Sequence, residues 1–305
     1  MNSLCSFLIL AKGVEYNDGQ PQRQCYRPPY NRPRQLARCL EALSAARDET
    51  FEVIVIDDGS PEPMEVITHV FADRLDITCL RQKNTGPAGA RNAGARVARV
   101  PILAFTDDDC RPEPDWLNKI TEAVQKNPQA LAGGRTYNSL EDNIFSETSQ
   151  DLISFLYEYT ARRDRGLRFF TSNNLACSAH CHAAIGGFDE SFPLAAAEDR
   201  DYSLRWIDMG WPLIYVPDTV MGHVHRLDFG RFWRQHFHYG RGVYHLRTRV
   251  AARQGERIRF EDIRFYALMA SYPFRRQRPR PFLRTVLLGL SQVAVMVGFI
   301  AESLG

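Results

Sequence analysis

The chain has 305 residues, of which 44% are hydrophobic and 24% are charged. This length and composition allow a sizeable core, and they exclude a disordered tail protein and a polytopic membrane protein. Lys and Arg number 38 against 36 Asp and Glu, so the net charge of +2 argues against a nucleic-acid partner. The seven scattered cysteines do not form the pattern of a disulfide framework and indicate a reducing compartment.

Short β-rich runs alternate with helical patterns after the first 30 or so residues. The runs are 53–56, 77–80 and 102–105, and each is followed by polar or glycine-rich residues. Helical spacing recurs before the first run and after the third, in Leu36, Leu40 and Leu43 and in Trp116, Ile120 and Val124. The alternation predicts an α/β sheet covered by helices, with ligands at the carboxyl ends of its strands.

Acidic residues follow two of these runs. Asp57 and Asp58 end the first, before Gly59 and Ser60, and Asp107-Asp108-Asp109 end the third. Adjacent carboxylates repel one another, so a neutralising cation is the physical explanation we favour for the second cluster. Hard oxygen ligands indicate Mg²⁺ or Mn²⁺, whose coordination shell substrate phosphates often complete. The alternative is an exposed acidic turn, and for the Asp57 pair alone a simple turn would be preferred.

The segment 84–94 lies between the two acidic ends. It is punctuated by glycines and carries Arg91 where a helix is expected to begin. Backbone amides at a helix start, together with an arginine fork, suit a diphosphate. A helix-capping loop is the alternative, and it would be preferred if the segment stood alone.

These segments, together with later ones, resemble the family 2 glycosyltransferases in order and rough spacing, from about Tyr30 to about Gly222. The later segments are Pro114 with Trp116-Leu117, Gly186-Gly187-Phe188-Asp189-Glu190, and Glu198-Asp199. The resemblance implies a GT-A fold, which is α/β with a mixed sheet flanked by helices. It also implies a nucleotide-sugar donor, a divalent metal and transfer with inversion at the sugar carbon.

The resemblance assigns nucleotide-sugar and metal sites. Asp57 and Asp58 would hold the base and ribose. The nucleotide-sugar site would also include Tyr30, Arg91, Asp107 and Asp108. Asp107 and Asp109 would form the Asp-x-Asp element, with Asp109 closest to the metal.

Inversion requires a general base opposite the departing diphosphate. Asp199 occupies the position that the family uses for this base, Glu198 is expected to support it, and Asp201 is expected at the surface. The alternative for all three is an acid-rich helix N-terminus, where the helix dipole favours carboxylates.

Histidines and cysteines offer further candidate ligands. His223 and His225 alternate at strand spacing, and in similar enzymes a histidine in this region joins the metal or the diphosphate. A structural histidine is the alternative for either residue. Cys177, Cys181 and His182 have no zinc-site spacing and are expected in the core.

The last third of the chain departs from the α/β pattern. We expect a helical aromatic and basic extension over 223–280, which either meets an acceptor or lipid head group or packs on the sheet. We expect a membrane helix over 281–303 with an arginine-rich flank, the alternative being a buried or interfacial helix. These features predict the cytoplasmic face of the cell membrane.

The first 28 residues do not fit the family. Members begin with an apolar strand before the turn at Tyr30, whereas 23–29 are polar here. If 23–28 are encoded CGT-CAG-TGT-TAT-CGT-CCC, a one-nucleotide shift reads Val-Ser-Val-Ile-Val-Pro, which is the missing strand. We therefore hypothesise that 1–28 is an irregular, frame-shifted segment ahead of a GT-A domain over 29–222. Leu4 to Leu10 is a substitute strand in the alternative interpretation.

The sequence as a whole predicts a membrane-associated, metal-dependent, inverting glycosyltransferase. It would move one sugar from a nucleotide donor to a glycan or lipid-linked acceptor, in cell-envelope polysaccharide synthesis. The Gln-x-x-Arg-Trp signature of processive synthases is absent beyond the catalytic portion, which favours single-sugar transfer. The alternatives are an inactive GT-A-fold binding protein and a nucleotidyltransferase, although the glycine-rich basic loop of the latter is missing.

Overall fold

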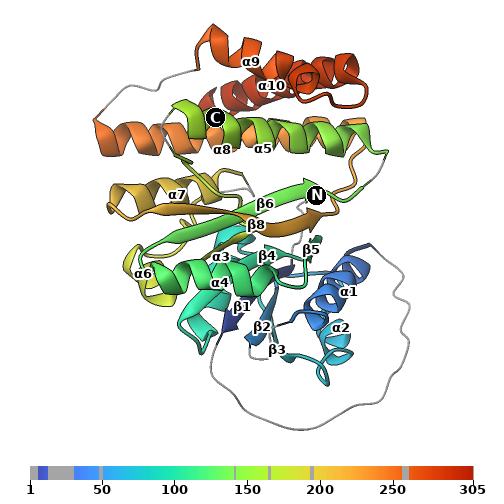
Figure 1. Ribbon diagram of the computed structural model, residues 1–305, viewed down its shortest axis with the longest axis vertical. Helices are drawn as coiled ribbons and strands as arrows, with labels where there is room; N and C mark the ends of the chain where they lie inside the picture. The colour runs from blue at the N-terminus through green and yellow to red at the C-terminus, as the bar shows by residue number, and fades with distance from the viewer. Residues whose placement is uncertain are drawn as a thin grey trace. The chain divides into compact units, whose positions relative to one another are not determined.

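The structure is a computed structural model that describes residues 6–12, 31–47, 51–140, 142–163, 166–192, 196–255 and 261–304. The chain divides into two compact units, whose elements are labelled in Figure 1. The sheet unit comprises Met1–Tyr137, Phe169–Ser191 and Tyr202–Val224, and the helical unit comprises Asn138–Arg168, Phe192–Asp201 and His225–Gly305. The junction at Val224 lies close to the predicted boundary at 222, but two earlier segments also belong to the helical unit.

The sheet unit is built on eight strands in the order β3-β2-β1-β4-β7-β6-β8-β5. The strands are β1 (Ser6–Lys12), β2 (Phe51–Asp57), β3 (Asp76–Arg81), β4 (Ile102–Asp107), β5 (Cys110–Pro112), β6 (Leu131–Asn138), β7 (Leu175–Ser178) and β8 (Leu213–His223). β2 and β3 pair in parallel, whereas β4 with β7 and β5 with β8 are antiparallel. The mixed sheet predicted from the sequence is confirmed.

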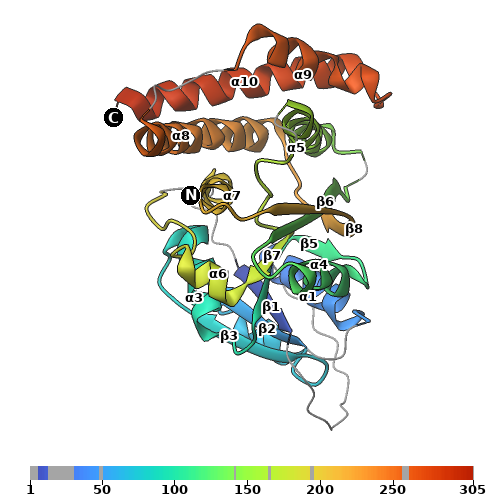
Figure 2. The same cartoon turned by 60° about the vertical axis from the view of Figure 1, so that its left-hand side comes forward.

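Helices cover both faces of this sheet, and Figure 2 shows α3 and α6 on one side and α1 and α4 on the other. The helices of the unit are α1 (Asn31–Ser44), α2 (Glu65–His69), α3 (Gly86–Val97), α4 (Trp116–Lys126), α6 (Ala179–Ala184) and the later part of α7 (Glu198–Asp208). Ile102 and Ala104 pack with the α1 and α4 side chains, whereas Phe105 meets the rings of His182 and Phe188 on the other face. A continuous apolar strand is therefore buried on both faces.

The N-terminal segment differs from the irregular segment that we expected. Ser6–Lys12 forms β1, which lies between β2 and β4 and pairs antiparallel with both. Its register places Ser6 opposite Asp57 and Phe7 opposite Asp107. An apolar run from the first residues thus fills the central gap, close to the Leu4 to Leu10 alternative, while 13–30 lie outside the described residues.

The helical unit contains four long helices and the first turn of α7. The long helices are α5 (Ile144–Arg163), α8 (Phe229–Gln254), α9 (Ile263–Arg275) and α10 (Pro281–Leu304). Figure 2 shows α10 running alongside α8. Glycines allow this approach, because a Cβ on Gly240 would lie 2.0 Å from the carbonyl oxygen of Val295, and one on Gly298 would lie 2.0 Å from that of Phe237.

Charged residues attach both ends of α10 to its neighbours. Arg284 is buried and donates to Asp151 at 2.6 Å and to Glu147, both on α5. Glu302 pairs with Arg241 and with His245, the latter at 2.7 Å, both on α8. Within the described chain, α10 alone has the length and mean hydropathy, 1.8, of a membrane-crossing helix, and 33% of that stretch is buried in the protein.

Candidate active site

The acidic turn after β4 is placed by strand pairing. β5 follows the turn directly and pairs with the end of β8, so that Cys110 lies opposite His223. This register brings Nε2 of His223 to 3.3 Å from Oδ1 of Asp109. The side chains of Asp107 and Asp109 are 25% and 11% exposed, whereas Asp108 is only 1% exposed. Asp107 and Asp109 are thus the partly open members of the triplet.

The acidic turn changes the pKa of His223. Burial by itself lowers the pKa of His223, but the negative charges of Asp109, Asp107 and Asp108 outweigh it, and the pKa is raised above its usual value. The imidazole therefore holds a proton more tightly than a free histidine does. A cation at the same carboxylates would compete with that proton, because each neutralises the same charge.

The residues at this turn fit a hard divalent cation. Asp107 and Asp109 offer carboxylate oxygens and His223 an imidazole nitrogen, a set that suits Mn²⁺ and Mg²⁺ better than a thiolate-seeking metal. Cys110 is buried, and burial together with the charge of Asp109 raises the pKa of its thiol, which argues against a thiolate ligand here. His225 begins the segment of the helical unit that follows Val224, so its place in the metal shell stays a prediction.

Arg91 joins the helix α3 to the acidic turn. Its side chain is only 3% exposed, and Nη2 lies 3.0 Å from Oδ1 of Asp107. The guanidinium also lies over the ring of Phe188, at 5.5 Å from its centroid. The pairing fixes the position of Asp107 and holds a positive charge beside the triplet.

Asp57 and Asp58 are both buried at the end of β2. Asp57 accepts hydrogen bonds from the amides of Ser60 at 2.8 Å and Met64 at 3.2 Å, and lies 3.4 Å from Arg81. These contacts fold the loop that follows β2. The assignment of Asp57 to the nucleotide-sugar site stays a prediction.

Asp58 serves as the cap of α3. It accepts from the amides of Thr85 and Gly86, both at 2.9 Å, and from Nε2 of Gln82 at 2.8 Å. The first amides of the predicted diphosphate loop thus have a carboxylate partner, as in the helix-capping alternative. The assignment of Asp58 to the nucleotide-sugar site stays a prediction.

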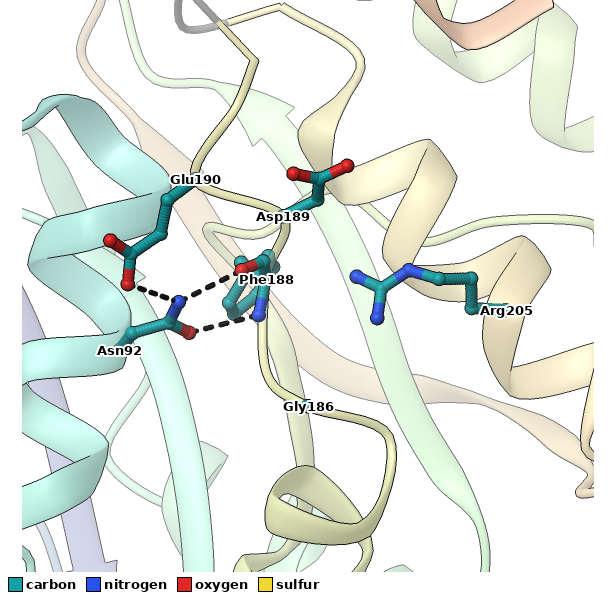
Figure 3. Close-up of a pocket in the computed structure, with 6 residues that line it drawn as sticks. All are labelled: Asn92, Gly186, Phe188, Asp189, Glu190 and Arg205. Carbon is teal, nitrogen blue, oxygen red and sulfur yellow. Dashed lines mark hydrogen bonds between the residues drawn. The ribbon is translucent and has the colours of Figure 1, made fainter. Parts of the chain in front are cut away.

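The glycine pair at 186–187 forms a clamped loop beside a pocket of about 370 Å³, drawn in Figure 3. Asn92 of α3 donates to the carbonyl of Phe188 and accepts from its amide, both at 2.8 Å. Arg205 of α7 donates to the carbonyls of Ile185 at 2.9 Å and Gly187 at 2.8 Å. Gly187 has φ +69°, and a Cβ there would lie 2.5 Å from Oδ1 of Asn92, so only glycine fits.

Asn92 and Arg205 had no assigned role in the sequence analysis. Asn92 stands inside the glycine-rich segment, whereas Arg205 carries no motif. Their hydrogen bonds go to backbone groups far away in the sequence, a kind of contact that residue spacing does not record. Tyr30, also predicted for the nucleotide-sugar site, lies outside the described residues.

The predicted base belongs to the helical unit. Asp199 is partly exposed and Glu198 is buried, both in the first turn of α7. The preceding residue, Ala197, has φ +72°, which is strained for a residue with a Cβ. Asp199 contributes to the surroundings of Tyr239, whose pKa is raised to about 12, mainly by burial and further by this charge.

Asp201 corrects one expectation. It was predicted at the surface, but it is fully buried and its Oδ1 lies 2.8 Å from Nη1 of Arg253 on α8. Further along α8, Gly242 approaches so closely that a Cβ would lie 2.3 Å from the carbonyl oxygen of Ala196. The helix α8 therefore holds the turn that carries Glu198 and Asp199.

Comparison with known families identifies the family of the chain. Residues 28–186, about half of the chain, match Glycosyl transferase family 2. The chain belongs to that family. Among curated relatives, the Chondroitin synthase of Pasteurella multocida (strain Pm70) is 29% identical over 217 residues, which cover 60% of this chain and 22% of that protein. Glycosyltransferase AglE of Haloferax volcanii is 25% identical, over 70% of each chain.

Solved structures confirm the fold. The mannosyltransferase PcManGT from Pyrobaculum calidifontis, in complex with GDP-Man and Mn²⁺, superposes with a TM-score of 0.61 at 15% identity, over 90% of this chain and 85% of that one. The predicted GT-A fold is therefore confirmed. Because the chain spans only about a fifth of the length of the Pasteurella synthase, the fold and the family carry over and the activity of the larger protein does not.

Proposed function

We propose that the chain is a metal-dependent, inverting glycosyltransferase that moves a single sugar from a nucleotide-sugar donor to a glycan or lipid-linked acceptor. The observation that carries the proposal is the convergence of Asp107, Asp109 and His223 at the ends of β4 and β8, in a chain of this family. A carboxylate–imidazole set beside Arg91 suits a diphosphate with its counter-ion.

In the proposed reaction, Asp199 takes the proton of the acceptor hydroxyl. The acceptor oxygen then forms a bond to the sugar carbon while the bond from that carbon to the diphosphate oxygen breaks, which inverts the carbon. Glu198 supports the base from its buried position one residue earlier. The strained backbone at Ala197, held by α8, fixes the direction in which the helix presents the base.

The diphosphate carries the negative charge that develops on departure. Arg91 lies at the acidic turn and would offset part of this charge. Asp109, His223 and His225, with Asp107, would hold a divalent cation, which supplies further charge neutralisation when bound. The Pyrobaculum enzyme was solved with Mn²⁺ and GDP-Man, which supports a metal and a nucleotide-sugar donor here.

The helical unit supports a location at the membrane surface, on its cytoplasmic face. α10 is apolar, yet its two ends are tied by ion pairs to α5 and α8, which are rich in charged residues. A helix fixed to charged neighbours along one face lies on a membrane more readily than it crosses one. Membrane-bound acceptors would fit cell-envelope polysaccharide synthesis.

One observation favours the inactive binding protein as a second candidate. Family members carry an apolar strand immediately before the turn at Tyr30, whereas here Ser6–Lys12 takes the place between β2 and β4 in an antiparallel direction. A chain with such a substitution can keep the fold and lose the nucleotide site.

The test is Mn²⁺-dependent release of nucleoside diphosphate from a panel of nucleotide sugars, with and without candidate acceptors. The chain is assayed beside a version in which 23–28 reads Val-Ser-Val-Ile-Val-Pro. Both versions are made with and without Asp199→Asn. Asp73→Asn, at an exposed position of the sheet unit, is the matched control. Release abolished by Asp199→Asn and kept by the control supports the proposal, and release confined to the restored version assigns the loss to the N-terminal segment. If both versions are folded and neither releases nucleoside diphosphate, the binding protein is favoured.

A further inference from the structure

A second cavity, of about 240 Å³, lies on the helical unit between α5 and α9. Its apolar wall is formed by Phe155 and Tyr159 of α5 and Leu268 of α9. The two aromatic rings pack together with centroids 5.6 Å apart. The cavity is large enough for a phosphate group with the first carbons of an alkyl or glycerol chain, and too small for a whole lipid.

Four charged residues complete the lining, and two of them have partners that neutralise them. The carboxylate of Glu158 accepts from the hydroxyl of Tyr272 at 2.9 Å and pairs with Arg276. Arg163 lies 2.8 Å from Glu261 and stacks over the ring of Tyr159. These two pairs therefore contribute no net charge to the cavity.

The other two charged lining residues are Arg162 and Arg275. In the part of the chain that the structure describes, neither has a carboxylate within ion-pair distance, and Arg275 donates only to the carbonyl of Leu268, at 2.9 Å. The cavity therefore carries two positive charges beyond its internal pairs. Two guanidinium forks above an apolar wall are suited to a phosphate that bears a hydrocarbon group.

We propose that this cavity binds the phosphate group of an anionic membrane lipid. Leu268 and Phe274, on the same helix as Arg275, are 39% and 51% exposed, so apolar side chains are open to acyl chains beside the arginines. The helix α10, which packs on α9, exposes a further apolar stripe that includes Phe282, Val293, Met296 and Ile300. Arginines beside exposed apolar side chains match the charge and polarity of an anionic bilayer surface.

The inference rests on the proposed membrane association and is independent of sugar transfer. The test is co-sedimentation of the full chain with vesicles of neutral phosphatidylcholine, or of phosphatidylcholine containing anionic phosphatidylglycerol. The variant is Arg162→Gln with Arg275→Gln. The matched control is Arg47→Gln with Lys126→Gln, which removes the same charge from exposed positions of the sheet unit. Circular dichroism and thermal melting check that each protein is folded.

The expected result is that the pocket variant binds anionic vesicles about 10- to 30-fold more weakly, since each of the two arginines contributes about three- to fivefold near an anionic surface. Neutral vesicles should bind both variants as they bind the parent. Equal binding of the pocket variant and the parent to anionic vesicles would overturn the inference, as would an equal loss in the control. Displacement by inorganic phosphate at low concentration would assign the cavity to a free anion instead. If the unsubstituted chain binds neither kind of vesicle, the membrane association itself is refuted. That result would not bear on nucleoside-diphosphate release.

Discussion

The two units hold their buried carboxylates in different ways. In the sheet unit, Asp57 and Asp58 are held mainly by backbone amides of loops that follow the strands. In the helical unit, Asp151 and Asp201 are held by arginine side chains from other helices. Substitutions other than to proline leave a backbone amide in place, whereas any substitution of an arginine removes its guanidinium.

The two units therefore differ in how many residues hold each part in place. The sheet unit places its acidic turn by strand register, which depends on many residues at once. The helical unit depends on single ion pairs and on two glycines between α8 and α10. We therefore expect substitutions at the ion pairs and glycines that pack the helical unit to act on stability, and those at the acidic turn and at Asp199 to act on catalysis.

The largest stability effect is expected at Arg284. Arg284→Met removes the guanidinium that pairs with Glu147, and it leaves the buried carboxylate of Asp151 with only the more exposed Arg278, at 2.9 Å. Loss of one partner from a buried pair costs about 3–5 kcal/mol. Urea unfolding, followed by circular dichroism, measures the change. Arg280→Gln is the comparison, because Arg280 and Asp142 form a pair at 3.8 Å in which both side chains are exposed to solvent. Loss of this pair should cost less than about 0.5 kcal/mol. Equal effects of the two would contradict the comparison.

At the acidic turn, Asp109→Asn should lower activity by about 100-fold or more, because a carboxylate in the proposed metal set is lost. Unfolding should change little, since removal of one of three adjacent negative charges relieves repulsion and offsets the lost His223 contact. Nucleoside-diphosphate release and Mn²⁺ titration measure the first effect, and thermal melting the second. Activity within threefold of the parent would exclude Asp109 from the metal site.

Two glycines of the helical unit, Gly240 in α8 and Gly289 in α10, should respond to alanine substitution with opposite changes in stability. Gly240→Ala places a methyl group against the carbonyl oxygen of Val295 and should cost about 1–3 kcal/mol, or separate α8 from α10. Gly289→Ala lies in α10 with nothing within 4 Å of its Cβ, and should stabilise by about 0.5–1 kcal/mol through helix propensity. Melting temperatures should move in opposite directions. A shift of the same sign in both would mean that the close approach does not limit packing.

Acid is expected to act on both units alike. Burial lowers the pKa of His182, in the sheet unit, to about 4, and that of His236, in the helical unit, to about 3. An unfolded histidine has a pKa near 6.5, so below that pH the unfolded chain binds more protons and stability falls. Each histidine should cost about 2 kcal/mol between pH 8 and pH 5.

The pH effect is measured by urea unfolding across that range. His182→Gln and His236→Gln should each flatten the dependence by about 2 kcal/mol, and the double variant should add the two. His69→Gln, at an exposed position, is the control for the loss of a histidine side chain as such. A slope that persists in the double variant would place the titrating groups elsewhere.

Sequence patterns predicted the parts of this molecule that repeat locally. Leu36, Leu40 and Leu43 gave a helix face that the structure buries in α1, and Val53 to Ile56 gave a strand that the structure buries in β2. The acidic ends were predictable for the same reason, because each follows a buried strand in the chain. Long-range contacts were not predictable: Asp201 looked like a surface acid until α8 brought Arg253 to it.

The N-terminal strand shows a second limit of sequence patterns. Ser6–Lys12 has the apolar character of a strand, but nothing in its residues sets the direction in which it pairs. Direction follows from where the chain re-enters the sheet, and β1 runs antiparallel to both of its neighbours. The polar residues at 23–29 indicated only that the expected strand was missing.

The smallest expected effect tests whether strain in the helical unit serves the base. Ala197→Gly relieves the cost, about 1 kcal/mol, that the left-handed conformation imposes on a residue with a Cβ. The added freedom of glycine in the unfolded chain offsets about 0.5–1 kcal/mol of this gain. Stability should therefore rise by less than about 1 kcal/mol or stay unchanged. If the strained turn fixes the direction of Asp199, kcat should fall severalfold with KM for the donor unchanged, because the loosened turn presents the base less often in the productive direction. An unchanged kcat with a higher melting temperature would show that the strain at Ala197 only allows α8 to pack against Ala196.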